Sequence, residues 1–298
     1  MQPMTCFKLT FAACLCAAMV GCGNDSGTDA DKGKSAAAPA KTAEVVIYTN
    51  ADEEAQTAMK NALDKNGMKG AYLIQSFGTS ELGGKLAAEG KNIEADVVTL
   101  STYYLDSFQK KEKLFADLQN KAKTIQPSPS YWTPILGNTG ALFVNTEVLK
   151  QSKLEAPKSI ADLAKPEYAG HISVPDIMGS STSWLMTQAV MSAQGEEAGA
   201  KTVAAIEKNA GAHLEKSGSG PLKKLRAGEA AVGFGLRHQA VADKARGLPI
   251  DYIDPTEGNF QLQEAAAVVD KGAKTNPNAQ KVVEIIVKYG RPELLKFY

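Results

Sequence analysis

The sequence contains few of the side chains that carry covalent or metal chemistry. It has four cysteines and three histidines in 298 residues. The cysteines, Cys6, Cys14, Cys16 and Cys22, all lie near the N-terminus. The rest of the chain therefore has no thiol with which to form a disulfide, a covalent nucleophile or a cysteine-ligated zinc site.

Common catalytic motifs are also absent from the sequence. His171, His213 and His238 do not form an HExxH pattern, no serine occupies a GxSxG motif, and no segment matches the complete GxxxxGK(S/T) phosphate-binding pattern. We therefore expect that the protein is not an enzyme and uses no cofactor. A secreted lipoprotein hydrolase that uses one of the serine-rich loops is a distant alternative.

Residues 1–22 have the pattern of an export signal. An apolar run from Leu9 to Val20 is too short to span a bilayer. The segment ends in Met19-Val20-Gly21-Cys22, which resembles the lipobox of bacterial lipoproteins. This resemblance implies cleavage before Cys22 and lipidation of Cys22, with the protein anchored to an envelope membrane and facing the periplasm or the cell exterior. An ordinary secretory signal is the alternative.

Residues 23–43 contain Gly, Ser, Asp, Ala and Lys but no large apolar side chain, which predicts a flexible tether. The remaining chain, residues 44–298, is long enough for two lobes. Its charges of both signs are interspersed, and the formal net charge of the chain is zero. This pattern does not indicate a nucleic-acid-binding surface.

Short apolar strands alternate with helices in the first part of this body. We expect strands over 45–48, 72–75 and 95–100 and helices over 53–65 and 81–89. Polar residues follow each strand: Asn50 and Asp52; Gly78, Thr79 and Ser80; and Ser101, Thr102 and Tyr103. Because the carboxyl ends of parallel strands lie at one edge of a sheet, these loops are expected to form one wall of a cleft.

A second group of polar residues lies further along the chain. Ser180, Ser181 and Thr182 precede an apolar helix over 184–191. Ser217, Gly218 and Ser219 precede a short helix of about two turns with Gly228 as its C-cap, followed by a strand over 230–234 and a loop that contains Arg237 and His238. Helix N-termini bind anions, and arginine binds phosphate or carboxylate bidentately, so this group predicts an anion site.

Several segments together resemble a known family. They are YTNADEE, ADVVTLSTYYLD, GALFVNTEVL, KSIADLAKPEYAGHISVPD and LRAGEAAVGFG. They resemble the extracellular solute-binding proteins of bacterial ABC importers, and within these the cluster of ferric-ion, 2-aminoethylphosphonate and hexose-phosphate binders. The resemblance implies an α/β fold of the two-lobed type 2 periplasmic-binding-protein kind, in which each lobe is a mostly parallel sheet flanked by helices.

The same resemblance implies how the chain is divided between the lobes. Two hinge crossings are expected, near 137–144 and 264–269. Lobe 1 would consist of 44–137 and 265–298, and lobe 2 of 138–264. Such a protein closes on its solute and delivers it to the transmembrane subunits of an ABC permease. We expect a monomer that touches the membrane only through the N-terminal lipid.

Individual residues in these segments indicate the kind of ligand. Ferric-ion binders of this cluster use an adjacent tyrosine pair in the loop that here reads Gly235-Leu236-Arg237-His238, and a histidine where Asp52 stands. The absent tyrosine pair favours an anionic or zwitterionic solute, best 2-aminoethylphosphonate or another organophosphorus compound. An inward-turned acid such as Asp52, Glu53, Glu54 or Glu81 would hold the ammonium group.

Two further roles complete the expected site. Glu257 would line its hinge side, and Tyr103 would pack on the carbon skeleton of the solute. Tyr103 and Tyr104 keep a rearranged metal site open, so a ferric-ion or anion-bridged metal binder is the alternative. Arg237→Ala is expected to weaken binding of an anionic ligand by about 2 kcal/mol or more.

Overall fold

The computed structural model describes residues 44–119, 121–124 and 127–297. The export signal, the lipobox with Cys22 and the tether over 23–43 lie outside the described residues, so lipidation at Cys22 stays a prediction. No helix in the described part of the chain is long and apolar enough to cross a membrane.

One nine-stranded sheet connects the whole body. Its strands follow the order β2-β1-β3-β9-β4-β7-β5-β6, and β8 also pairs with β4. The strands are β1 (Val45–Thr49), β2 (Tyr72–Ser76), β3 (Val97–Ser101), β4 (Thr133–Asn145), β5 (Ile172–Pro175), β6 (Leu214–Glu215), β7 (Val232–Leu236), β8 (Ile250–Ile253) and β9 (Gln261–Val268). β1 pairs in parallel with β2 and β3, and β5 pairs in parallel with β6 and β7.

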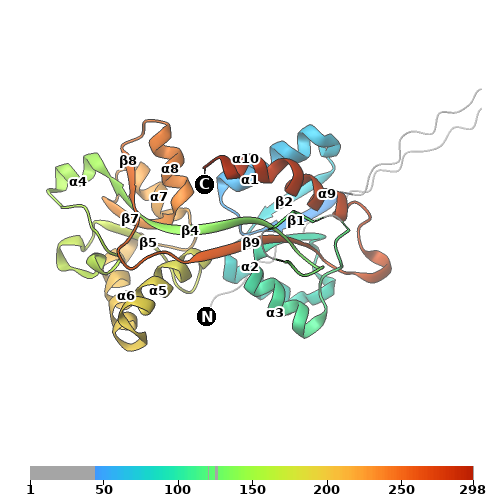
Figure 1. Cartoon of the computed structure of the whole chain (residues 1–298), viewed down its shortest axis with the longest axis horizontal. Coiled ribbons are helices and arrows are strands. Elements are labelled where there is room, and N and C mark those ends of the chain that lie inside the picture. The colour runs from blue at the N-terminus through green and yellow to red at the C-terminus, as the bar shows by residue number, and fades with distance from the viewer. Residues whose placement is uncertain (1–43, 120, 125–126, 298) are drawn as a thin grey trace, which may run out of the picture. The chain divides into compact units, whose positions relative to one another are not determined.

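Two long strands join the two lobes (Figure 1). β4 pairs antiparallel with β9 through residues 133–139 and then with β7 through residues 140–144. β9 pairs on its other side with β3. The expected crossing at 137–144 falls within β4, and that at 264–269 overlaps β9. The expected fold class, two lobes with two crossings, is therefore confirmed.

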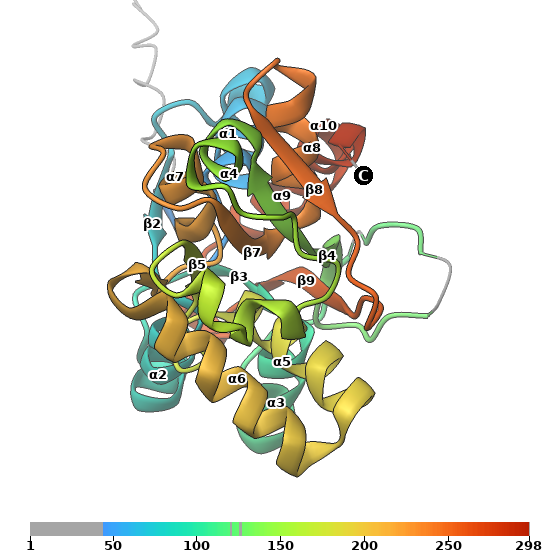
Figure 2. The same ribbon diagram turned by 90° about the vertical axis from the view of Figure 1, so that its left-hand side faces the viewer.

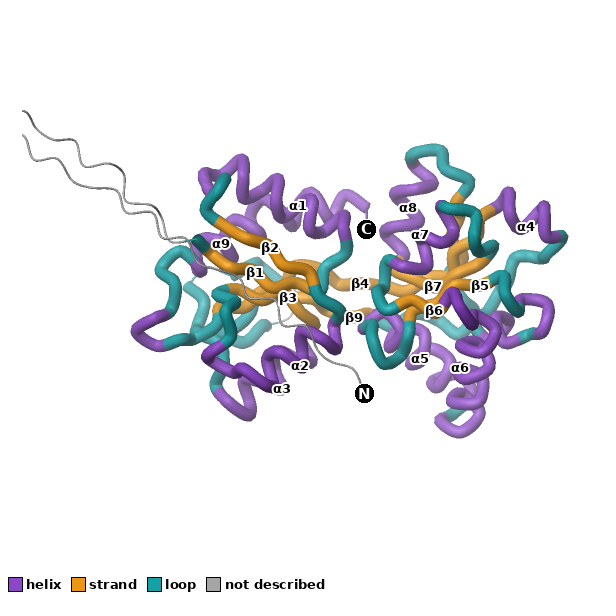
Figure 3. Tube along the Cα trace, turned by 180° about the vertical axis from the view of Figure 1, so that it is seen from behind, coloured by secondary structure: helices purple, strands orange, loops and turns teal. Residues whose placement is uncertain are grey.

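Helices cover both faces of the sheet in each lobe. In the first lobe, which contains β1, β2 and β3, the helices are α1 (Glu53–Leu63), α2 (Thr79–Glu89), α3 (Thr102–Glu112), α9 (Ala279–Ile285) and α10 (Arg291–Leu294). In the second lobe they are α4 (Thr146–Ser152), α5 (Ser181–Gln194), α6 (Glu196–Ala210), α7 (Gly220–Arg226) and α8 (Arg237–Ala245). Figure 2 shows α5 and α6 below the strands of the second lobe with α4, α7 and α8 above, and Figure 3 shows α1 and α2 on opposite faces in the first lobe.

Each lobe has its own apolar core. Buried side chains such as Ile47, Leu63 and Val282 pack together in the first lobe, and Ile172 and Phe234 belong to a separate cluster in the second. Separate cores allow the lobes to move as units about β4 and β9. The exact residue boundaries of the lobes stay a prediction.

Two helices begin earlier than the sequence pattern predicts, α2 against the prediction over 81–89 and α5 against that over 184–191, whereas α3 and α8 correspond to no predicted helix. α2 begins at Thr79, α3 at Thr102 and α8 at Arg237, in segments expected to be loops. Gly235 and Leu236, also expected in a loop, end β7. In each case the residue before the helix has extended backbone angles and serves as N-cap. A polar first turn at the edge of a cleft resembles a loop in sequence because its side chains are not apolar.

Candidate solute-binding site

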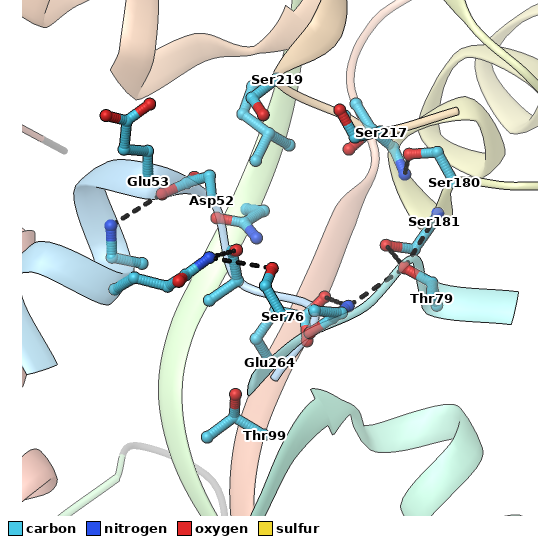
Figure 4. Close-up of a pocket in the computed structure, with 18 of the residues that line it drawn as sticks. Asp52, Glu53, Ser76, Thr79, Thr99, Ser180, Ser181, Ser217, Ser219 and Glu264 are labelled. Carbon is cyan, nitrogen blue, oxygen red and sulfur yellow. Dashed lines mark hydrogen bonds between the residues drawn. The ribbon is translucent and has the colours of Figure 1, made fainter. Parts of the chain in front are cut away.

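A cavity of about 420 Å³ lies between elements of both lobes. Figure 4 shows polar side chains from several segments directed toward it. Charged and hydroxyl-bearing residues dominate its lining: Asp52, Glu53, Ser76, Thr79, Glu81, Thr99, Ser180, Ser181, Thr182, Lys216, Ser217, Ser219, Lys223 and Glu264. Asn50, Gly78 and Gly218 also line it. A cavity with so many hydrogen-bonding groups suits a small polar solute.

The first turns of α2 and α5 meet across the cleft. Thr79 Oγ1 donates to Ser181 Oγ at 3.0 Å, and Ser80 Oγ donates to the Met178 carbonyl oxygen at 2.7 Å. These contacts come from opposite lobes. They place the N-terminal, positive ends of two helices against the same cavity, and such helix ends favour negative charge.

The segment Ser217–Ser219 packs against the beginning of α5. Ser180 caps that helix by accepting a hydrogen bond from the Thr182 amide at 3.2 Å. A Cβ atom on Gly218 would collide with Thr182 Oγ1 and lie 2.9 Å from Thr182 Cβ. Only glycine therefore lets this loop approach the helix so closely. The result is a cluster of Ser180, Ser181, Thr182, Ser217 and Ser219 along one side of the cavity.

The opposite side of the cavity is held by the acidic first turn of α1. Asp52 caps α1, with its Oδ1 accepting from the Ala55 amide at 2.7 Å. Its other oxygen lies 3.1 Å from Nε2 of His238 at the start of α8. Asp52 is thus the N-cap of α1. The contact with His238 places both residues at the boundary between the lobes.

Glu53 and Glu54 also reach the second lobe. Glu54 accepts from Arg226 at 3.2 Å and from Gln239 at 3.1 Å. Glu53 lies 3.5 Å from Lys223. Arg226 is itself fixed by the buried Asp243, whose two oxygens accept from Nε at 2.6 Å and from Nη2 at 2.9 Å. The acidic turn thus joins the lobes through charges of opposite sign.

Glu264 also lines the cavity. The sequence pattern placed Glu264 only in the hinge crossing and did not predict it as a site residue. The half-buried side chain lies on β9 and lines the cavity. The Asn50 amide is hydrogen bonded to Glu264 Oε1 at 3.4 Å and to Thr79 Oγ1 at 3.1 Å. Burial raises the pKa of Glu264 to about 8, and the negative charge of Asp52 adds to this effect. A lone acid before the apolar run AAAVV was the available signal.

The structure thus brings most of the predicted residues together and separates a few. Those that line the cavity are Asn50, Asp52, Gly78, Thr79, Ser180, Ser181, Thr182, Ser217, Gly218 and Ser219. Ser80 does not line it but bonds across the cleft. Ser101 is buried at the end of β3, Thr102 begins α3, and the Tyr103 side chain is 76% exposed. Tyr103 is therefore not positioned against the cavity.

Arg237 and His238 stand elsewhere than the sequence analysis expects. Arg237 Nε donates to Asp254 Oδ1 at 2.9 Å, and its guanidinium lies 4.4 Å from the ring centre of Tyr252. Arg237 and His238 are the first two residues of α8 and do not lie in a loop, and neither lines the cavity. The helix turns Arg237 toward β8, and it directs His238 toward Asp52.

Glu257 does not line the hinge side of the site as expected, and its carboxylate is instead bound to a neighbouring segment of the second lobe. Its carboxylate accepts from the amides of Ile160 at 3.0 Å and Ala161 at 2.8 Å, at the start of the short helix Ala161–Ala164. Anions are favoured at helix N-termini, which accounts for this contact. Glu257 does not line the cavity.

The tyrosines considered for a metal site do not converge with other ligands. Tyr103 and Tyr104 pack edge to face on α3 with their ring centres 5.7 Å apart. Within the described ranges, no group of three His, Cys, Asp or Glu side chains is arranged to hold a metal ion.

Two lobes joined by two strands, with a polar cavity between them, define a receptor for a small solute. The chain belongs to the family of bacterial extracellular solute-binding proteins, whose pattern matches residues 93–288. It is thus a periplasmic solute-binding protein. This confirms the family predicted from the sequence.

Characterised relatives differ in the solute that they are named for. The chain is 29% identical over 213 residues to the Fe(3+)-binding periplasmic protein of Serratia marcescens, covering 68% of this chain and 59% of the relative. It is 26% identical over 220 residues to the spermidine/putrescine-binding periplasmic protein of Escherichia coli, covering 67% of this chain and 60% of the relative. The matches therefore span less than two thirds of these relatives.

Solved structures share the fold at low sequence identity. The periplasmic binding protein AfuA of Actinobacillus pleuropneumoniae, with fructose-6-phosphate bound, has a TM-score of 0.70 and 21% identity, covering 85% of this chain and 82% of that one. The iron-bound HitA of Pseudomonas aeruginosa has a TM-score of 0.62 and 19% identity, covering 85% of this chain and 84% of that one. These similarities establish the fold of the chain.

Proposed function

We propose that this protein captures a small anionic or zwitterionic solute, with 2-aminoethylphosphonate or another organophosphorus compound as the best candidate. The observation that carries the proposal is the convergence of two helix N-termini, those of α2 and α5, on one cavity with the Ser217–Ser219 segment. Backbone N–H groups at helix N-termini and serine hydroxyls hold phosphate-like oxygens.

Charge in the cavity supports the same choice of solute. Lys216 and Lys223 line it, as do Asp52, Glu53, Glu81 and Glu264. A solute with both an anionic and an ammonium group would meet complementary charge on both, whereas a simple anion would meet several carboxylates. Arg237 has no part in this version of the site, because its guanidinium bonds Asp254.

Binding would draw the lobes together. The hydrogen bonds of Thr79 with Ser181 and of Ser80 with Met178 join opposite lobes directly beside the cavity. A solute that touches both lobes favours the closed arrangement by the difference in its affinity for the closed and open states. The closed protein would then deliver the solute to the transmembrane subunits of a permease, held near the membrane by a lipid on Cys22.

Isothermal titration calorimetry tests the proposal. Residues 23–298, expressed without the lipid, would be titrated with 2-aminoethylphosphonate, a hexose phosphate, inorganic phosphate, putrescine and ferric citrate. A ligand that binds the folded state must also raise the melting temperature, which gives a second readout. Tight binding of an organophosphorus compound supports the proposal. If no organophosphorus compound binds while a solute of another class clearly does, the proposal is refuted.

Ferric ion is the second candidate, because the relative from Serratia marcescens is named as an Fe(3+)-binding protein. Iron here would need oxygen ligands such as Asp52 and Glu264, or an anion that bridges it to the serine cluster. A melting-temperature rise with ferric citrate, absent with citrate alone, would support this candidate.

A further inference from the structure

Glu264 occupies an unusual position for a carboxylate. It lies on β9, one of the two strands that join the lobes, opposite Ser101 of β3 and Leu136 of β4. Its side chain is half-buried and faces the cavity. The described residues provide it with a hydrogen bond from Asn50 but with no ion pair to a lysine, arginine or histidine.

The charged groups around the cavity do not neutralise Glu264. Lys223 lies near Glu53, and Lys216 makes no ion pair in the described part of the chain. Asp52, Glu53 and Glu81 are acids that line the same cavity, and His238 is directed to Asp52. A carboxylate that has lost part of its hydration gains stability from a cation close to it. Neither lysine that lines the cavity pairs with Glu264, which leaves its carboxylate open to an ammonium group on the solute.

The anion-binding groups lie close to Glu264 on the other side of Asn50. One amide, that of Asn50, is hydrogen bonded to both Thr79 Oγ1 and Glu264. The hydroxyl and the carboxylate are therefore within two hydrogen-bond lengths of each other, and Thr79 in turn donates to Ser181. Figure 4 shows Glu264 between Asp52 on one side and Thr79 on the other. A short zwitterion can span this distance.

We infer that Glu264 is the residue that recognises an ammonium group on the solute and so selects amine-bearing solutes over simple anions. This inference rests on the proposed function in placing the anionic end of the solute at the Thr79 and Ser181 side. The ammonium nitrogen would donate to the Glu264 carboxylate and displace the weak contact from Asn50.

Binding of an ammonium group at Glu264 has a consequence that can be measured. With a pKa of about 8, Glu264 is mostly protonated at pH 7 in the free protein. An ammonium group stabilises the ionised form, so Glu264 transfers its proton to the solvent as the solute binds. At pH 7 the expected release from this group is about 0.9 proton per solute bound. Comparison with Glu264→Gln isolates the contribution of this group to the release.

The experiment compares four probes: 2-aminoethylphosphonate, ethylphosphonate, putrescine and inorganic phosphate. Calorimetric titrations of the wild type and of Glu264→Gln, each in two buffers of different ionisation enthalpy, give affinity and proton release together. We expect wild type to bind 2-aminoethylphosphonate at least tenfold more tightly than ethylphosphonate. Glu264→Gln should lose this preference and the associated proton release. Gln263→Ala, an exposed neighbour on the other face of β9, should retain both.

The failures of the inference and of the proposed function are distinct. Equal wild-type affinity for 2-aminoethylphosphonate and ethylphosphonate, or an unchanged preference in Glu264→Gln, overturns the role of Glu264 while the organophosphorus site stands. Binding of putrescine without binding of any phosphonate, lost in Glu264→Gln, overturns the organophosphorus proposal while Glu264 keeps its role. Failure of wild type to bind either amine-bearing probe overturns the inference, and this comparison needs no variant to fold.

Discussion

His238 Nε2 lies 3.1 Å from Asp52 Oδ2, and the two nearly buried side chains join the start of α8 to the start of α1. These residues are far apart in the sequence and belong to opposite lobes. Their contact stabilises the arrangement in which the two lobes enclose the cavity. The contact lies beside the cavity, but His238 does not line the cavity. His238 therefore acts on binding through the position of the lobes.

His238→Ala should weaken solute binding by opening the cleft. Loss of a hydrogen bond to a charged group costs roughly 1.5–3 kcal/mol, so we expect about a tenfold or larger rise in Kd. Small-angle scattering should show a larger radius of gyration at low solute concentration. His171→Ala, a change away from the cavity, is the control. Unchanged affinity and radius in His238→Ala would show that the contact does not hold the lobes together.

Glu54→Gln should also favour the open arrangement, to a smaller degree. Glu54 accepts from Arg226 and Gln239 across the cleft, and its side chain is partly exposed. We expect a loss of about 1 kcal/mol in binding, which shrinks as salt concentration rises. Glu89→Gln, whose ion pair with Lys85 lies within one helix and away from the cavity, should change affinity far less. Equal effects of the two changes would contradict this ranking.

Gly218→Ala should displace the Ser217–Ser219 segment from α5. The added Cβ would collide with the Thr182 hydroxyl, so either the loop or the first turn of α5 must move. Strain of this kind costs roughly 1–3 kcal/mol, and we expect a lower melting temperature together with a tenfold or larger loss of affinity. Gly84→Ala, at an exposed helical position with open space around the new Cβ, should leave both nearly unchanged. Wild-type affinity in Gly218→Ala would remove this loop from the site.

Arg237→Ala should leave solute affinity within about twofold of wild type. The sequence alone predicts a loss of about 2 kcal/mol, but the guanidinium bonds Asp254 and lies on Tyr252, away from the cavity. The ion pair is partly exposed, so its loss should lower stability by less than about 1 kcal/mol. Calorimetric titration decides between the two expectations, and a large loss of affinity would restore Arg237 to the site.

Glu264→Gln should change how the stability of the solute-free protein depends on pH. The pKa of Glu264 is raised from 4.5 to about 8, so between these values the folded state binds more protons than the unfolded state. Stability of the wild type therefore falls as pH rises from about 5 to about 8, by an amount on the order of a few kcal/mol from this group. Glutamine carries no such penalty. The melting temperature of the variant relative to wild type should be higher at pH 8 than at pH 5, and a constant difference would contradict the raised pKa.

Local patterns in the sequence predicted several of the elements. The β-branched run at Val45 indicates a strand, the acid-rich turn after Asp52 indicates a helix start, and Gly228 indicates a helix end. The structure contains all three. Strand ends in a parallel sheet gather at one edge, so the cavity residues Asn50, Thr79 and Ser180 were also predictable.

Directions of side chains at the site were not predictable in the same way. Arg237 and His238 are adjacent at the start of α8, and one bonds Asp254 while the other meets Asp52. Whether such residues are in a loop or in the first turn of a helix depends on where the strand ends, and the pattern of polar residues is the same in both cases. Glu264 was overlooked for a related reason, because one acid beside an apolar run does not reveal which face of the strand meets a cavity.

The sequence by itself determined the class of this protein, several of its strands and helices, and the polar segments from which a binding site could be built. These depend on local preference and on periodicity, which neighbouring residues carry. Only the tertiary structure decided which charges meet across the cleft, that Asp52, Glu53 and Glu54 contact the second lobe, and that Glu264 faces the cavity with Asn50 as its hydrogen-bond partner. Those relationships join residues distant in the chain, and the packing of two lobes about β4 and β9 sets them.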